Sequence, residues 1–194
     1  MAQLDVLIRS AKIVDGTGSL WRYGDIALRG ERIVEVCSPN VLAHSSASEV
    51  IDARGKVVCP GFIDIQSHSI VPLMIDGRCL SKITQGVTTE IMGEGWTPAP
   101  FGGRMEKALS EGVYGERLTE WVERAGQWHR FGDWLSAMVK VGVSPNVGSF
   151  LGAGTLREYA MGLEMRTPTK DELAQMQHLM AEAMEDGAFG PSYA

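Results

Sequence analysis

Three polar residues could carry chemistry in this chain, because each follows a segment with the pattern of a β-strand: Gln66, His68 and Glu94. Gln66 and His68 are two positions apart, so on an extended strand their side chains share one face. Gly93 and Gly95 flank Glu94, and glycines let the backbone approach other groups closely. An imidazole and a carboxylate that converge at one rim can bind a divalent metal ion and activate water. We therefore predict a metal site formed by His68 and Glu94, with Gln66 as a weaker ligand.

The same residues also have a structural interpretation, which the pattern alone leaves open. A single histidine after a strand often supports the fold, and an acid in a glycine-rich turn is often solvated. We expect structural roles for the remaining histidines. His44 lies in an expected loop, His129 in a helical stretch rich in tryptophan, and His178 in the middle of a helix.

A metal site of this kind needs neighbouring strands that end at one edge of a sheet. The apolar run at 57–65 is typical of a strand buried on both faces of a parallel sheet, and we expect Cys59 within it to lie in the core. Further strands are predicted at 87–92, at 146–151 and near 188–190. Segments with a helical pattern separate them, at 73–85, 103–126, 129–140 and 156–161. This alternation predicts an α/β fold with a parallel sheet and crossover helices.

Two other segments have clear local signals. Residues 4–36 alternate with period two between turns, which predicts a small antiparallel β unit. Thr169 and Glu172 fit a capping box at the start of a helix, and Gly187 is typical of the position after its end. The apolar face predicted for this helix consists of Leu173, Met176, Met180, Ala183 and Met184.

Composition limits the class of protein. The chain has 194 residues, 44% of them hydrophobic and 22% charged, as is ordinary for a soluble globular protein. A net charge of −6 argues against a nucleic-acid partner, and no apolar run reaches the roughly 20 residues of a membrane helix. Three widely spaced cysteines and no signal-peptide pattern predict a cytoplasmic protein. A TIM barrel or a doubly wound sheet would both fit, although no dinucleotide-binding fingerprint is present.

Several motifs match a known family. The segment CPGFIDIQSH at 59–68 resembles the first barrel strand of the amidohydrolase superfamily, whose pattern is P-G-F-I-D-x-H-x-H. Residues 5–18 and 24–33 resemble the opening of the N-acyl-D-amino-acid deacylases, or D-aminoacylases. Further segments that match this family are 85–89, 146–149, 154–157 and 186–194.

The resemblance implies a fold and an activity. We expect a small antiparallel β-sandwich segment at 1–56, followed at 57–194 by about the first four strands of a TIM-like (β/α) barrel. The implied reaction is zinc-assisted hydrolysis of a linear amide, with a small N-acyl-D-amino acid as substrate. The resemblance places the catalytic residues beyond residue 194 and identifies no substrate-binding residue. Gln66 stands where the family has its first histidine, and Gly95 stands where many members have a cysteine ligand.

Two alternatives accompany this expectation. The chain could be a truncated, inactive amidohydrolase, or a subunit that needs a second chain to complete the barrel. An open half-barrel would expose strand edges, so we expect self-association or a completing chain. A hydantoinase-like or dihydroorotase-like enzyme is the third hypothesis, and the Gly-Thr-Leu-Arg segment at 154–157 favours the deacylases over it.

Overall fold

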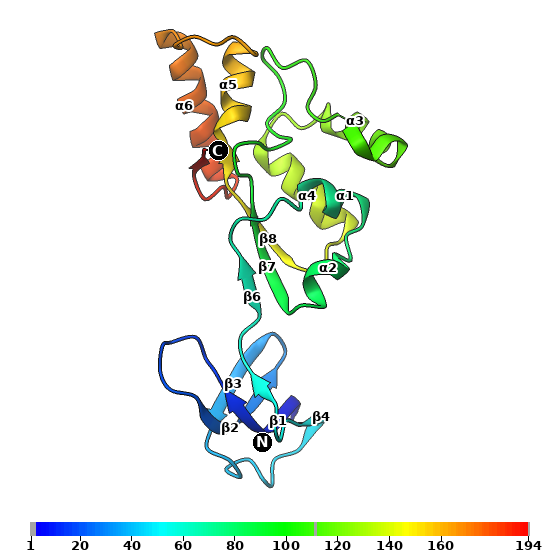
Figure 1. Cartoon of the computed structure of the whole chain (residues 1–194), viewed down its shortest axis with the longest axis vertical. Helices are drawn as coiled ribbons and strands as arrows, with labels where there is room; N and C mark the ends of the chain where they lie inside the picture. Colours follow the sequence, from blue (N-terminus) through cyan, green and yellow to red (C-terminus); the bar gives the residue numbers. More distant parts are fainter. Residues whose placement is uncertain (1–2, 111, 194) are drawn as a thin grey trace. The chain divides into compact units, whose positions relative to one another are not determined.

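The computed structural model describes residues 3–110 and 112–193, so Ala194, the end of the expected fourth-strand motif, lies outside the described residues (Figure 1). The chain divides into two compact units, Met1–Pro60 and Gly61–Ala194. We expected this division between residues 56 and 57. It falls after Pro60 because strand β5, Val57–Val58, pairs in parallel with the first strand of the first unit.

The first unit is built on one sheet whose other strands are β1 (Leu4–Ile13), β2 (Arg22–Arg29), β3 (Arg32–Cys37) and β4 (Ala47–Asp52). The order β3-β2-β1-β4 has antiparallel pairs β3–β2 and β2–β1, as predicted for residues 4–36. However, β4 and β5 both run parallel to β1. The expectation of wholly antiparallel pairing is therefore wrong for the described residues of this unit, which form one mixed sheet. The loop between β3 and β4 is long enough to return the chain and lay β4 parallel to β1.

The second unit has the predicted parallel α/β organisation. Strands β6 (Phe62–Asp64), β7 (Val87–Met92) and β8 (Asn146–Ser149) form a parallel sheet in chain order. A further strand, β9 (Leu151–Gly152), continues from β8 and pairs in parallel with β10 (Pro191–Ser192). Helices connect β6 to β7, β7 to β8 and β9 to β10, so the carboxyl ends of the parallel strands lie at a common edge.

The segment 57–65 is not the single buried strand that its composition predicts. It is divided into β5 and β6, and β6 is an edge strand that pairs only with β7 among the described strands. Phe62 and Ile63 are 57% and 63% exposed for this reason. Cys59, between the two strands, is also exposed rather than in the core.

The helices within 73–85 and 103–126 are shorter than their patterns predict, whereas the helix predicted at 156–161 begins earlier, at Ala153. The helices of the second unit are α1 (Ile70–Ile75), α2 (Leu80–Ile83), a 3₁₀ segment η1 (Gly112–Leu118), α3 (Thr119–Ala125), α4 (Phe131–Val141), α5 (Ala153–Met161) and α6 (Lys170–Glu185). A helix at 73–85 does not form, because Cys79 adopts a left-handed conformation with φ of 49° between α1 and α2. Residues 103–110, expected in a helix, are irregular. The core between sheet and helices contains Trp121, Trp128 and Trp134.

Helix α6 begins with the predicted capping box. Thr169 Oγ1 accepts a hydrogen bond from the Glu172 N–H at 3.2 Å, and the Glu172 carboxylate accepts one from the Thr169 N–H at 2.8 Å. Its buried face differs from the prediction: Leu179 and Ala183 are buried, whereas Leu173 and Met184 are about half exposed. Figure 1 shows α6 beside α5, and the contacts between these two helices fix which side of α6 is covered.

Candidate functional site

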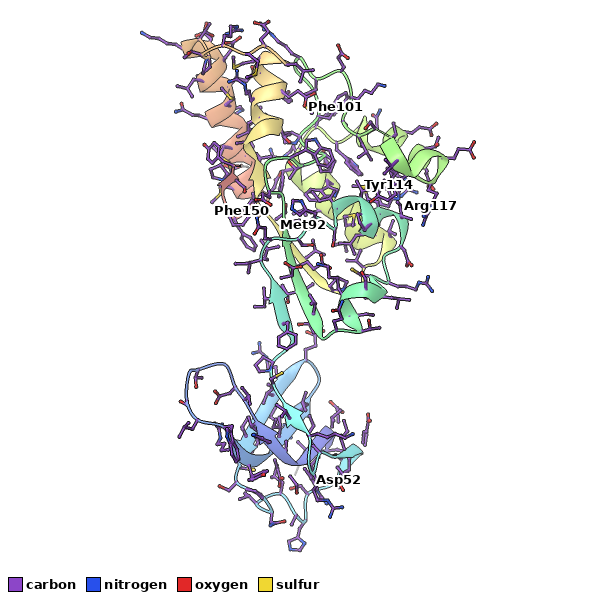
Figure 2. All side chains as sticks on the ribbon, viewed as in Figure 1. Asp52, Met92, Phe101, Tyr114, Arg117 and Phe150 are labelled. Carbon is purple, nitrogen blue, oxygen red and sulfur yellow. The ribbon has the colours of Figure 1, made fainter. Side chains whose placement is uncertain are left out.

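Two neighbouring strands position the residues that could carry chemistry. β6 ends at Asp64 and β7 ends at Met92, and the two strands are parallel, so the segments that follow them leave the sheet at the same edge. The Ser67 N–H donates to the carbonyl oxygen of Ile91 at 3.0 Å and holds the segment after β6 against β7. In Figure 2, Met92 and Phe150 mark the carboxyl ends of β7 and β8.

The structure brings Gln66, His68 and Glu94 together. Gln66 Nε2 donates to Glu94 Oε1 at 2.7 Å, and His68 Nε2 lies 3.2 Å from Glu94 Oε2. The His68 side chain is 76% exposed and that of Glu94 is 26% exposed, so the imidazole is open to a ligand while the carboxylate is partly enclosed. Gly93, with φ of 90°, makes the turn that brings Glu94 back towards the neighbouring strand end.

Asp64, the last residue of β6, holds the backbone at Gln66 in place below this site. Its carboxylate is paired with the Lys82 ammonium of α2 and accepts a hydrogen bond from the Gln66 N–H at 3.2 Å. The hydrogen bond from Lys82 and, less strongly, the one from Gln66 lower the pKa of Asp64 below its usual value. Asp64 therefore stays ionised at neutral pH and supports the strand end.

A buried polar cluster that the sequence analysis did not identify lies behind the site. The Glu90 carboxylate on β7 is fully buried and accepts hydrogen bonds from Ser67 Oγ and, at 3.1 Å, from Cys79 Sγ. Ser67 and Ser69, on either side of His68, are 2.8 Å apart through their Oγ atoms. Burial and the nearby Glu90 raise the pKa of the Cys79 thiol to about 11. The sequence signal for this cluster was Glu90, an acid in the middle of a segment predicted to be a buried strand.

The other histidines stay away from this site. His44 is exposed in a loop, the Nδ1 atom of His129 is 3.2 Å from the carbonyl oxygen of Phe101, and His178 lies 3.7 Å from Glu182 on α6. Within residues 3–110 and 112–193, no group of three or more His, Cys, Asp and Glu residues could hold a metal ion. His68 and Glu94 thus supply two donors of a suitable kind, one fewer than the three protein ligands of a usual catalytic zinc site.

A cleft borders Glu94 and extends between α5 and α6; we call it the α5–α6 cleft. Its volume is about 770 Å³, and its apolar walls are formed by Trp96, Leu156, Leu173, Met176, Met180 and Tyr193. A smaller cavity of about 210 Å³ adjoins Gln66 and Glu94 on the side of Phe150. The site formed by Gln66, His68 and Glu94 therefore has space for a ligand beside it. Along the described ranges of the chain, none of the helices is long and apolar enough to cross a membrane.

The chain resembles known deacylases in sequence along nearly its whole length. No family model matches the chain. It is 36% identical over 192 residues to N-acyl-D-aspartate deacylase of Alcaligenes xylosoxydans xylosoxydans, a match that covers 98% of this chain and 36% of that protein. The chain thus spans about a third of the length of this curated relative.

Solved structures give the same result for the fold. A crystal structure of D-aminoacylase is 34% identical and superposes with a TM-score of 0.82, covering 98% of this chain and 38% of that one. N-acyl-D-glutamate deacylase from Bordetella bronchiseptica, solved with zinc and a phosphonate inhibitor, is 28% identical with a TM-score of 0.80, over 99% of this chain and 38% of that one. Since likeness in sequence and in fold extends over nearly all of its residues, the chain belongs to the N-acyl-D-amino-acid deacylase family of the amidohydrolase superfamily.

Proposed function

We propose that this chain contributes His68 and Glu94 to the metal site of a hydrolase that cleaves the amide C–N bond of N-acyl-D-amino acids. The observation that carries the proposal is the Glu94 carboxylate, which engages Gln66 at 2.7 Å and His68 at 3.2 Å at the ends of two adjacent parallel strands. In enzymes built on parallel α/β sheets, this edge is where catalytic groups gather. At least one further ligand must join these two.

Zinc is the metal that we propose, because an imidazole and a carboxylate are both good zinc ligands and a similar deacylase was solved with zinc. When bound, the metal would polarise the amide carbonyl and lower the pKa of its water. Gln66, predicted from its position as a weaker ligand, has a different role in this proposal. Its amide N–H orients Glu94 Oε1 and leaves the other carboxylate oxygen directed at His68.

A TIM-like barrel is the architecture that we propose for the second unit. The support is its set of parallel strands in chain order with helical crossovers, together with the exposed outer side of β6. The chain would then hold about the first four strands of the barrel. The relatives' greater length agrees with this proposal, since the match covers 36% of the aspartate deacylase.

The alternative is a protein with no catalysis of its own, either an inactive fragment or a subunit that a second chain completes. It is favoured by the number of metal donors, because the described residues bring two strong ligands together where a catalytic zinc site normally has three. We propose a cytoplasmic location and a small-molecule substrate both for the enzyme and for the alternative in which a second chain completes the subunit.

Removal of one ligand tests the metal site. We expect Glu94→Ala to weaken zinc binding by about tenfold or more, measured by titration calorimetry on the whole chain. Glu116→Ala, an exposed acid on η1, is the matched control and should leave zinc binding unchanged. Unchanged zinc affinity in Glu94→Ala would refute the role of Glu94. Hydrolysis of N-acetyl-D-amino acids by the zinc-loaded chain, measured alongside, would exclude the inactive alternative.

A further inference from the structure

Glu94 lies on an irregular segment that follows β7, residues 93–99, which we call the Glu94 loop. Such a segment has no ladder of backbone hydrogen bonds, so its position depends on contacts with other parts of the chain. Within the loop, the Trp96 N–H donates to the carbonyl oxygen of Glu94 at 2.8 Å. This bond fixes a local turn, but it does not hold the turn beside His68. The contacts that hold it come from the start of α5.

The first turn of α5 lies directly against the backbone of the Glu94 loop. The Gly154 N–H donates to the carbonyl oxygen of Gly95 at 2.8 Å. A Cβ atom at Gly154 would lie 2.6 Å from that oxygen, and one at Gly152 would lie 2.3 Å from the Trp96 nitrogen. Glycine at these two positions therefore permits an approach of two backbones that any side chain would prevent.

One hydroxyl on the same turn of α5 satisfies both backbone polar groups of Thr97. Thr155 Oγ1 accepts a hydrogen bond from the Thr97 N–H at 2.8 Å and donates to the Thr97 carbonyl oxygen, also at 2.8 Å. The two residues are fully buried, although they are 58 positions apart in the chain. Because a buried backbone group without a partner is costly, the loop can leave this position only by giving up both bonds.

We propose that Thr155 is a positioning residue for the candidate metal site, whose hydroxyl fixes the Glu94 loop and so holds the Glu94 carboxylate beside His68. Thr155 acts through the backbone of Thr97, three residues after Glu94. The inference rests on the proposed function and adds a residue from the connection after β9 to it. If the Thr155–Thr97 pair only stabilised the fold, its loss would lower stability and leave the zinc affinity of the folded chain unchanged.

Removal of the hydroxyl tests the proposal on the whole chain. We expect Thr155→Val, which keeps the shape of the side chain, to weaken zinc binding about fivefold in titration calorimetry. Thr155→Ser keeps the hydroxyl and should stay within about twofold of the unaltered chain. Thr169→Val is the matched control, because it removes the hydroxyl that caps α6 and should lower the midpoint of urea unfolding without changing zinc affinity. Unchanged zinc affinity in Thr155→Val would overturn the proposal.

A double variant shows whether Thr155 acts through Glu94. Zinc binding by Glu94→Ala should weaken little further when Thr155→Val is added, because the ligand that Thr155 positions is already gone. Two losses that add in full would mean that Thr155 affects zinc by another route, and the proposal would then be wrong.

Amide hydrogen exchange follows the loop without metal. In the zinc-free unaltered chain the Thr97 N–H should be strongly protected, and Thr155→Val should remove that protection whereas Thr155→Ser should keep it. If the Thr97 N–H of the unaltered chain exchanges as fast as an exposed amide, Thr155 does not fix the loop. This measurement on the unaltered chain decides if Thr155→Val fails to fold.

A steric change provides a second perturbation of the same contact. Gly154→Ala should push the Gly95 backbone away and weaken zinc binding about threefold, although it leaves the Thr155 hydroxyl in place. Gly126→Ala at the end of α3 is the control, since its Cβ would lie 3.4 Å from the nearest atom, the carbonyl oxygen of Glu123. Equal zinc affinity of Gly154→Ala and its control would count against the proposal.

The same titrations separate this inference from the proposed function. If Glu94→Ala leaves zinc affinity unchanged, the proposed metal site is refuted. If Glu94→Ala weakens zinc but Thr155→Val and Gly154→Ala do not, the metal site stands and the positioning role of Thr155 is refuted. Weaker binding in all three variants, without addition of the losses from Glu94→Ala and Thr155→Val, supports both.

Discussion

At the residue scale, Glu90 holds the backbone that carries His68, through hydrogen bonds that involve both neighbours of His68. Its carboxylate is fully buried among sheet and helices, where an uncompensated polar group would be costly. Ser67 Oγ and Cys79 Sγ donate to it, and Ser67 in turn accepts a hydrogen bond from the Ser69 N–H at 3.2 Å. The backbone on both sides of His68 is thus tied to one buried acid.

We predict that loss of this acid destabilises the second unit. Glu90→Ala should lower the free energy of unfolding by about 3 kcal/mol, because it leaves a cavity and several buried donors without an acceptor. Glu90→Gln keeps an acceptor oxygen for Ser67 and should cost about 1 kcal/mol. Urea denaturation of both variants measures the difference. Equal stability of Glu90→Ala and the unaltered chain would show that the buried hydrogen bonds contribute nothing.

At the scale of elements, Arg130 and Asp186 link helices α4 and α6. Arg130, the residue before α4, pairs with Asp186 at the end of α6 at 2.8 Å and with Glu182 at 3.1 Å. The Asp186 carboxylate also accepts a hydrogen bond from the Gly132 N–H at 3.0 Å, in the first turn of α4. A negative charge at this helix N-terminus is favourable.

This contact predicts an acid-sensitive part of the stability. The hydrogen bond from Arg130 lowers the pKa of Asp186, so the folded chain holds the ionised form more strongly than the unfolded chain does. The stabilisation is complete above the unfolded pKa of about 3.9 and is lost as the pH falls through the lower folded value. Asp186→Asn should therefore cost about 1 kcal/mol at pH 7, and its difference from the unaltered chain should shrink as the pH falls below the unfolded pKa of Asp186.

Thermal unfolding at several pH values measures that difference. The matched control is Glu185→Gln, because Glu185 lies 3.7 Å from Arg130 with a side chain 75% exposed, and its effect should be smaller. A difference between Asp186→Asn and the unaltered chain that does not shrink as the pH is lowered would contradict the assignment.

Exposed apolar residues on an edge strand are the main feature at the scale of the whole molecule. β6 pairs with β7 on one side, and Phe62, Ile63 and Ile65 are 57%, 63% and 74% exposed. Unpaired strand edges with apolar side chains are sites where chains associate. The proposed half-barrel would leave this edge open to a second copy or to a completing chain.

We predict that the chain associates through this edge in a concentration-dependent manner. Ile63→Lys should shift the equilibrium to monomer, because a charge on an edge strand opposes pairing with another strand. Leu163→Lys, at a residue 84% exposed outside the sheet, is the control and should leave association unchanged. Sedimentation velocity over a range of concentrations distinguishes these outcomes. A monomer at every concentration in the unaltered chain would refute the prediction.

Local patterns in the sequence were sufficient for many elements. The range 87–92 predicted β7 to the residue, and the Thr169–Glu172 pair predicted the start of α6, because strand alternation and helix capping depend on neighbouring residues. Local patterns did not predict features that depend on residues far apart in the chain, such as which strands pair and which are exposed. β6 is exposed because β7 is its one partner among the described strands, and β4 lies parallel to β1 because of a long return loop.

By itself, the sequence determined the α/β class of the second unit, the family and the three residues at the strand ends. Only the tertiary structure decided that Glu94 meets Gln66, 28 residues earlier in the chain, and that the amide serves as its hydrogen-bond donor. It also decided that Glu90 is buried behind His68 and that Thr155 meets Thr97. Residue type and spacing specify what a side chain can do, whereas sheet register and helix packing fix which groups come within a few ångströms of it.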